Sequence, residues 1–396
     1  MAVFGHSGSQ APQLMHSSVI IIAICFLPKF AIKYKVSTSI FLSRMTLAQR
    51  IEAFAKLGEF LSQFSPSGLK VNASLQSNAL FLEPFQIQVK RAFENNGWFT
   101  RDNVFSSFND WGKLLNYNNL IKFTSTYNLH ESSDKSVAVI MAGNIPLVGF
   151  HDFLTVLLAG KSIRVKQSSS DAFFLPLIAR FLEHVESGFK GKIVFQDENL
   201  TGFDAVIATG SNNTARHFEY YFGNYPHIIR KNRNSVAVLT GDESEAELQG
   251  LGEDIFRYFG LGCRSVSKLM APKGYDFDKL FGAIYSFKNL IEYEKYRNNY
   301  DYNKAVYLMS EFDLLENGFV MLKEDNSYAS PIATVFYEYY EDNVSLNEKL
   351  EADAELIQCV VGKGLEIEQV PFGQTQKPRL NDFADGVDTM EFLVNL

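Results

Sequence analysis

One cysteine near the middle of the chain, Cys263, has the side chain with the most chemistry to offer. It follows Gly262 and precedes Arg264, between a helix-like stretch (251–259) and an apolar run (266–270). A thiol reached through small residues at the mouth of a turn can attack a carbonyl carbon. Most free cysteines are instead small buried hydrophobes, so the assignment needs support from other segments.

Asn144 offers the first such support. It closes an expected strand at 136–141, and Pro146 stiffens the turn that follows. A side-chain amide fixed at this point can donate a hydrogen bond to a developing oxyanion, as such donors do in acyl transfer. An asparagine that only forms an Asx-turn is the structural alternative.

Lys166 and Ser168 carry groups suited to a nucleotide. Lys166 directly follows an expected strand at 162–165, and Ser168 precedes a helix. A lysine at the carboxyl end of a strand can hold ribose hydroxyls or a phosphate, with the serine as a further donor. A surface lysine beside an ordinary helix cap is the alternative.

Thr209, Gly210 and Ser211 form a second segment of this kind, between a strand at 205–207 and a helix at 214–222. The start of a helix offers unpaired amides and a positive dipole end to an anion. Simple capping of the helix by Ser211 is the alternative. The chain has no G-x-G-x-x-G motif, so a dinucleotide would not be held by the usual phosphate loop.

Short β-branched runs alternate with helical stretches from residue 135 onward, and this alternation is typical of a parallel, doubly wound sheet. Ligands of such sheets collect at the carboxyl ends of the strands, where all three upstream segments lie. The first half is expected to hold strands at 136–141, 162–165, 193–195 and 205–207, with helices at 148–158, 173–185 and 214–222.

The two remaining parts of the chain complete this outline. Residues 46–130 have helical periodicity, and Thr46 is the expected N-cap of the first helix. A second α/β lobe is expected from a helix at 243–259 and strands at 236–239, 266–270, 319–322, 332–339 and 357–361.

Composition excludes several classes of protein. The 396 residues are 46% apolar and carry a net charge of −8 without a basic patch, which argues against a nucleic-acid partner. Cys25, Cys263 and Cys359 lie far apart, as in neither a disulfide framework nor a zinc site, so we expect no metal and a cytoplasmic, reducing location. The apolar run Val19–Pro28 is shorter than the ~20 residues that span a bilayer, so no stable membrane insertion is expected.

In combination the segments resemble the aldehyde dehydrogenase superfamily, in their order from Asn144 through Lys166 and Gly210–Ser211 to Cys263. More closely, the chain resembles the acyl-CoA reductase family, which includes the reductase subunit of the fatty-acid reductase complex of luminous bacteria. This resemblance covers residues 45–396 and rests on four segments: 230–235, 262–265, 371–374 and 388–390.

The resemblance implies two doubly wound α/β lobes with the active site in the cleft between them. Residues 45–235 would form the N-terminal helices and nucleotide-binding lobe, and residues 236–396 the lobe of the catalytic cysteine. Residues 1–44 are interpreted as a disordered or artefactual extension rather than a signal sequence.

The implied activity is NAD(P)H-dependent reduction of fatty acyl-CoA or acyl-protein thioesters to aldehydes, through an acyl-enzyme on Cys263. Asn144 would stabilise the oxyanion. NADPH, or else NADH, would bind at Lys166, Ser168 and the Thr209–Ser211 turn. A homo-oligomer, or an acyltransferase or synthetase partner, is the assembly expected from the family.

The segment before the cysteine departs from hydrolytic aldehyde dehydrogenases, because His227–Asn232 contains no acid to activate water. Without that base a thioester on Cys263 should resist hydrolysis. His217 and His227 are the candidate proton carriers, and Arg230 and Lys231 either lower the thiol pKa, bind CoA phosphates or form a solvated charge run.

Two rival hypotheses keep the fold. In the first, the protein is an acyltransferase that carries an acyl group on Cys263 without hydride transfer. In the second, the protein is an interaction scaffold with a dehydrogenase fold that has lost its activity. The retained set of Cys263, Asn144 and Lys166 argues against the second.

Overall fold

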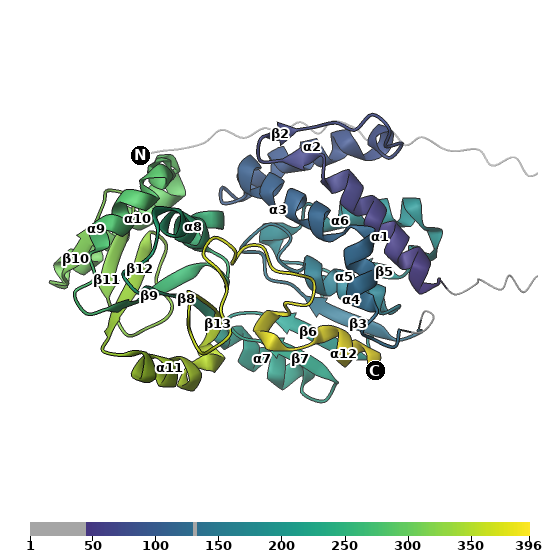
Figure 1. Cartoon of the computed structure of the whole chain (residues 1–396). Coiled ribbons are helices and arrows are strands. Elements are labelled where there is room, and N and C mark those ends of the chain that lie inside the picture. The colour runs from purple at the N-terminus through teal and green to yellow at the C-terminus, as the bar shows by residue number, and fades with distance from the viewer. Residues whose placement is uncertain (1–44, 130–132) are drawn as a thin grey trace, which may run out of the picture. The chain divides into compact units, whose positions relative to one another are not determined.

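A five-stranded parallel sheet forms the centre of the first lobe in the computed structural model, which describes residues 45–129 and 133–396. The expected extension 1–44, with Cys25, lies outside the described residues. The strand order is β5-β4-β3-β6-β7 (Figure 1). The strands are β3 (Ser136–Ile140), β4 (Ser162–Lys166), β5 (Ile193–Phe195), β6 (Ala205–Thr209) and β7 (His227–Arg230).

Alternate residues of these strands face two different layers of helices, because successive side chains of a strand point to opposite faces. Val137 and Val139 belong to a core with α5 (Phe150–Leu158) and α6 (Leu175–Val185), whereas Ala138 packs with α7 (Asn212–Phe222). Further helices cover the first of these cores: α1 (Leu47–Leu61), α2 (Asn78–Asn95), α3 (Arg101–Leu114) and α4 (Tyr117–Thr124). The small hairpin of β1 (Phe64–Ser65) and β2 (Gly68–Leu69) follows α1.

Phenylalanine rings fill much of this core. Phe60 lies 5.0 Å from Phe85 and 5.1 Å from Phe181, between centroids, and so joins α1, α2 and α6. Helix α1 begins at the expected Thr46 cap, whose hydroxyl accepts from the Gln49 amide in a reciprocal capping box.

A six-stranded sheet in the order β10-β11-β12-β9-β8-β13 forms the centre of the second lobe, and all its pairs are parallel except β10–β11. The strands are β8 (Asn234–Val238), β9 (Val266–Pro272), β10 (Leu314–Glu316), β11 (Met321–Glu324), β12 (Thr334–Tyr340) and β13 (Ile357–Val361). Helices α8 (Glu245–Phe256) and α9 (Phe277–Ala283) pack on one face, and α11 (Asn343–Ala352) packs on the other. Helix α10 (Glu294–Met309) packs beside Phe259 and Met321. The expectation of two doubly wound α/β lobes is confirmed.

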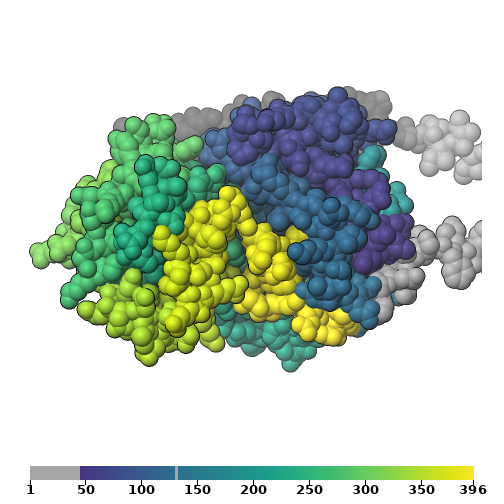
Figure 2. Space-filling model, viewed as in Figure 1, coloured from purple at the N-terminus to yellow at the C-terminus, as the bar shows by residue number. Residues whose placement is uncertain are grey.

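The C-terminal segment (residues 362–396) leaves β13 in the second lobe and returns to the first (Figure 1). Leu380, Met390 and Leu393 are buried in the core of the first lobe, and α12 (Thr389–Val394) packs on α5. In the space-filling view this yellow segment covers the surface where the lobes meet (Figure 2). The division into domains at residue 235 stays a prediction, to which the structure adds this returning segment.

Candidate active site

The loops that follow β3, β4 and β6 lie side by side, because these three strands are neighbours in the first sheet. The structure therefore brings Asn144, Lys166 and the Thr209–Ser211 turn to one edge, as the strand order requires. The first two loops touch: a Cβ built on Gly143 would lie only 2.6 Å from Cβ of Ser168. Glycine at 143 permits this close approach.

Asn144 also reaches across to the other lobe. Its Nδ2 donates to the backbone oxygen of Leu261 at 2.7 Å, two residues before Cys263. Its Oδ1 is buried and has no hydrogen-bond partner among the described residues. The amide that we expect to bind an oxyanion thus lies at the cysteine loop. Its Nδ2 carries two protons, and one of them is donated to Leu261.

A sharp turn presents this loop to Asn144. The helix expected at 243–259 stops at Phe256, since Tyr258 and Phe259 adopt left-handed backbone angles (φ of 55° and 59°). These angles are uncommon for bulky residues. Phe259 is held by packing on Trp98 of the first lobe, with ring centroids 5.1 Å apart.

Cys263 is exposed, and a hydrogen bond to its backbone carbonyl holds it in place. Its carbonyl accepts from the Ser235 hydroxyl at 3.0 Å, and Ser235 Oγ lies 3.0 Å from Sγ of Cys359. Because Ser235 has a single proton and donates it to Cys263, the Cys359 thiol must be the donor in the second bond. Cys359 therefore serves to fix Ser235.

The thiol of Cys263 needs help to lose its proton. Although the residue is exposed, the protein atoms around it displace water, and this desolvation raises the pKa of Cys263 to about 11. Arg264 lowers that pKa, whereas the nearby charges of Asp385 and Cys359 raise it further. Of the two cations considered from the sequence, Lys231 is not among the groups that shift this pKa. Arg230 does interact with the cysteine, because the charge of Cys263 raises the pKa of Arg230.

Arg230 instead forms a buried ion pair. Its guanidinium donates to both carboxylate oxygens of Asp152, at 2.6 and 2.9 Å, and to the Thr389 hydroxyl at 2.8 Å. The side chains of Arg230 and Asp152 are 5% and 9% exposed. Lys231 is 60% exposed and lies 3.5 Å from Glu219, so it belongs to the solvated charge run that was the alternative.

The C-terminal segment lines the cysteine loop. Asp254 of α8 accepts hydrogen bonds from the backbone amides of Gly373 and Thr375, at 2.7 and 3.0 Å. Arg264 donates to the carbonyl of Thr375 at 2.6 Å. The segment 371–374, one basis of the family resemblance, is thus attached directly beside Cys263.

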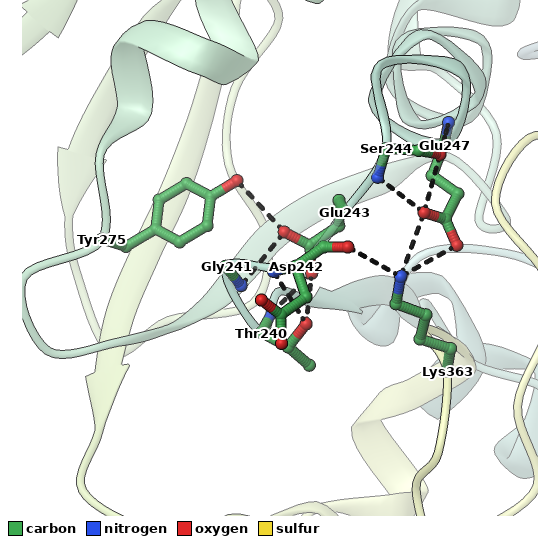
Figure 3. Close-up of polar contacts among 8 residues, drawn as sticks. All are labelled: Thr240, Gly241, Asp242, Glu243, Ser244, Glu247, Tyr275 and Lys363. Atoms are coloured by element: carbon green, nitrogen blue, oxygen red, sulfur yellow. Dashed lines mark hydrogen bonds and ion pairs between the residues drawn. The ribbon is translucent and has the colours of Figure 1, made fainter.

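A cluster at the start of α8 anchors the beginning of this segment (Figure 3). Lys363 donates to the backbone oxygen of Asp242 at 3.0 Å and to both carboxylate oxygens of Glu247, at 3.0 and 3.1 Å. Glu247 also completes the capping box of Ser244. The segment is therefore bound to the second lobe at residue 363 and to the first at Thr389.

Asp385 is a site residue that the sequence did not reveal. Its Oδ1 lies 3.6 Å from Nε of Arg233, and its side chain is 11% exposed. The charge of Asp385 raises the pKa of the Cys263 thiol. The segment His227–Asn232 lacks an acid, but the C-terminal segment supplies one.

The groups expected to hold a nucleotide have the required donors. Lys166 Nζ donates to the backbone oxygen of Glu198 at 2.9 Å, and Ser168 Oγ caps a short 3-10 helix, Ser169–Asp171. Ser211 Oγ accepts from the Thr214 amide at 3.2 Å and so caps α7, as the structural alternative predicted. An ammonium, hydroxyls and helix-start amides suit ribose and phosphate oxygens.

Neither histidine lies among the groups that contact Cys263 or shift its pKa in the described chain. His227 opens β7 at the end of the strand opposite Arg230, and its Nδ1 lies 2.8 Å from the Tyr225 carbonyl. His217 is exposed on α7. The structure gives no support to either as a proton carrier.

Asp171 holds the turn that carries Asn144. Its Oδ2 accepts from the amide of Leu147, which has a left-handed φ of 60°, at 2.9 Å. Burial raises the pKa of Asp171 to about 8 from its ordinary 3.8, although the bond from Leu147 offsets part of the rise. The turn thus depends on a carboxyl group that resists ionisation.

Asp171→Asn should change how stability depends on pH. Between pH 4 and 8 the unfolded chain ionises this carboxyl while the folded chain keeps its proton, so wild-type stability falls as pH rises through that window. Asparagine keeps an acceptor for Leu147 and removes the titration. Denaturant midpoints at pH 5 and pH 8 should show the variant gaining on the wild type as pH rises. Exposed Asp301→Asn is the control, and the same gain there would contradict the assignment.

Comparison with known proteins identifies the fold. No protein-family model matches the sequence, and no curated protein matches it. Aldehyde dehydrogenase 21 from Physcomitrella patens matches 89% of this chain with 84% of its own, at a TM-score of 0.64 and 11% identity. An NAD-dependent aldehyde dehydrogenase from Sinorhizobium meliloti matches 81% of this chain with 71% of its own, at a TM-score of 0.57 and 12% identity. Betaine aldehyde dehydrogenase from Staphylococcus aureus matches 81% of this chain with 71% of its own, at a TM-score of 0.54 and 15% identity.

At these low identities the likeness shows the fold alone. The chain has the aldehyde dehydrogenase fold, and Cys263 lies where its two lobes meet, because Asn144 of the first lobe contacts the loop before it. Within residues 45–129 and 133–396, no helix has the length and apolar content needed to cross a membrane.

Proposed function

We propose that this protein reduces fatty acyl thioesters, of CoA or of an acyl-protein, to aldehydes with a nicotinamide nucleotide. One observation carries the proposal: the Asn144 amide reaches the Cys263 loop from the edge of the sheet that presents Lys166 and the Thr209–Ser211 turn. The candidate nucleophile, oxyanion donor and nucleotide-binding groups thereby lie on neighbouring loops. The sulfur chemistry fits the fold of the aldehyde dehydrogenases named above.

In the proposed reaction Sγ of Cys263 attacks the thioester carbon, and the carbonyl electron pair moves to the oxygen. That oxyanion receives a hydrogen bond from Nδ2 of Asn144. When it collapses, the bond to the CoA sulfur breaks and the acyl group remains on Cys263.

The nucleotide would be held by Lys166, Ser168 and the start of α7, where Thr209 and Gly210 lead into the Ser211 cap. When bound there, it supplies the hydride that takes the thioester to the aldehyde level. The Staphylococcus aureus structure is a complex with NAD+, and the Sinorhizobium meliloti protein is named as NAD-dependent. Both descriptions support a nicotinamide nucleotide as the cofactor. We propose NADPH first, with NADH tested beside it.

Absorbance at 340 nm with a long-chain acyl-CoA tests the proposal, combined with intact-mass detection of the acyl adduct. Consumption of NADPH with formation of aldehyde is the expected result. An adduct without NADPH or NADH consumption would establish the acyltransferase alternative. Neither adduct nor consumption would leave the scaffold hypothesis.

Asn144→Ala should reduce turnover far more than stability. Removal of one oxyanion donor typically costs on the order of 3 kcal/mol in the barrier. Ser106→Ala is the matched control, because the Ser106 hydroxyl accepts another contact between the lobes, from Arg257 at 3.2 Å, away from the cysteine loop. A large fall in melting temperature with intact turnover for the Asn144 variant would favour a purely structural asparagine.

A further inference from the structure

The Cys263 thiol is carried on a four-residue turn, and contacts with other elements hold that turn. The amide of Ser265 donates to the carbonyl of Gly262 at 2.9 Å, so Cys263 and Arg264 are the two central residues of the turn. The Ser235 hydroxyl holds the carbonyl of Cys263 from one side. The position of the thiol then depends on what holds the last residue of the turn.

Gln376 of the C-terminal segment binds that last residue. Its Nε2 donates to Oγ of Ser265 at 3.3 Å. Its Oε1 lies 3.8 Å from the position of a Cβ built on Gly262, so the side-chain amide reaches both ends of the turn. Ser265 is only 2% exposed, so water does not readily replace a lost partner of its hydroxyl.

The backbone next to Gln376 is itself fixed. Asp254 of α8 accepts from the amide of Thr375 at 3.0 Å and from its hydroxyl at 2.9 Å, and both residues are buried. The carbonyl of Thr375 in turn accepts from Arg264. Two consecutive residues of the C-terminal segment therefore hold two consecutive residues of the turn, and the Gln376 side chain acts from a rigid base.

We propose that Gln376 is a positioning residue for Cys263, a role that rests on the proposed function and acts through Ser265. In that function the acyl carbon must meet Sγ of Cys263 while its oxygen meets Nδ2 of Asn144. A displacement of about 1 Å can cost about 10²-fold in the rate of such a step. Gln376 would hold the turn in the one position in which both contacts form together.

Gln376→Met should slow acylation without weakening substrate binding. Methionine has nearly the length of glutamine but offers Ser265 no hydrogen-bond donor. The single-turnover rate of adduct formation at saturating acyl-CoA should fall about 10-fold, whereas the acyl-CoA concentration that gives half of this rate should not change. Alkylation of Cys263 by iodoacetamide needs no aligned carbonyl, so it should stay within about twofold of the wild type.

Ser265→Ala removes the other partner of the same bond and allows a double-mutant cycle. Each single variant should acylate about 10-fold more slowly than the wild type, and the double variant should also be about 10-fold slower, because the same bond is lost only once. A fall of about 10²-fold in the double variant would mean that the two residues act independently, and it would overturn the inference.

Gln374→Met is the matched control, since Gln374 is an exposed glutamine two residues earlier on the same segment. It should acylate and alkylate at the wild-type rates. The inference is overturned if this control slows as much as Gln376→Met, if Gln376→Met loses alkylation together with acylation, or if it acylates at the wild-type rate.

The choice of acyl donor separates this inference from the proposed function. If the wild-type protein forms no adduct from acyl-CoA, the proposed function fails. The same cycle is then measured with p-nitrophenyl acetate, an activated ester that acylates thiols without CoA and releases coloured nitrophenolate. Coupling between Gln376 and Ser265 would still support positioning of Cys263, and additive or absent effects would overturn it.

Discussion

Cys263→Ala is expected to abolish both the acyl adduct and aldehyde formation. Alanine has no group that can attack a carbonyl carbon, and Cys263 carries an exposed thiol on the loop that the Asn144 amide contacts. Intact-mass measurement after incubation with acyl-CoA should show one added acyl group on the wild type and none on the variant.

Cys359→Ala is the control for this experiment. Cys359 is only partly exposed and donates to Ser235, so its loss should cost some stability and leave the adduct in place. A covalent acyl group on the Cys263→Ala protein would contradict the assignment of the nucleophile.

Arg230→Met is expected to cost about 3–5 kcal/mol of unfolding free energy, because it leaves the buried charge of Asp152 without its partner. The change also removes the bond to Thr389 and so loosens the C-terminal segment. Urea denaturation followed by circular dichroism measures the loss. Exposed Lys231→Met should stay within about 0.5 kcal/mol of the wild type.

A double variant distinguishes the ion pair from simple packing. Asp152→Leu combined with Arg230→Met removes both charges, and it should be more stable than Arg230→Met alone. Equal or lower stability of the double variant would show that the loss arises from packing rather than from an unpaired charge.

Much of the first sheet could be predicted from the sequence, because β3 and β6 are apolar runs that end in turn residues. No strand was predicted at 227–230, where β7 extends the sheet. Only Ile228 and Arg230 of that strand are buried, and a buried arginine does not resemble a strand core. The partner that makes Arg230 tolerable is Asp152 on α5, a contact invisible in the local sequence.

Part of the candidate site could also be predicted from the sequence, and part of it could not. Asn144, Lys166 and Ser211 could be proposed because each follows a predicted strand, and adjacent parallel strands bring such loops together. Asp385 could not, since it lies in a segment without helical or strand periodicity that is placed by contacts with distant residues. The cation it pairs with, Arg233, is far away along the chain.

The order in which the chain is synthesised determines when the C-terminal segment can make its contacts. A growing chain releases both sheets from the ribosome before it releases Asp385 and Thr389, and domains fold as they emerge. During that interval Arg230 can hold Asp152, but its bond to Thr389 and the pairing of Arg233 with Asp385 must wait. The Cys263 loop can therefore form on a nascent chain before the contacts made by Asp385 and Thr389 are in place.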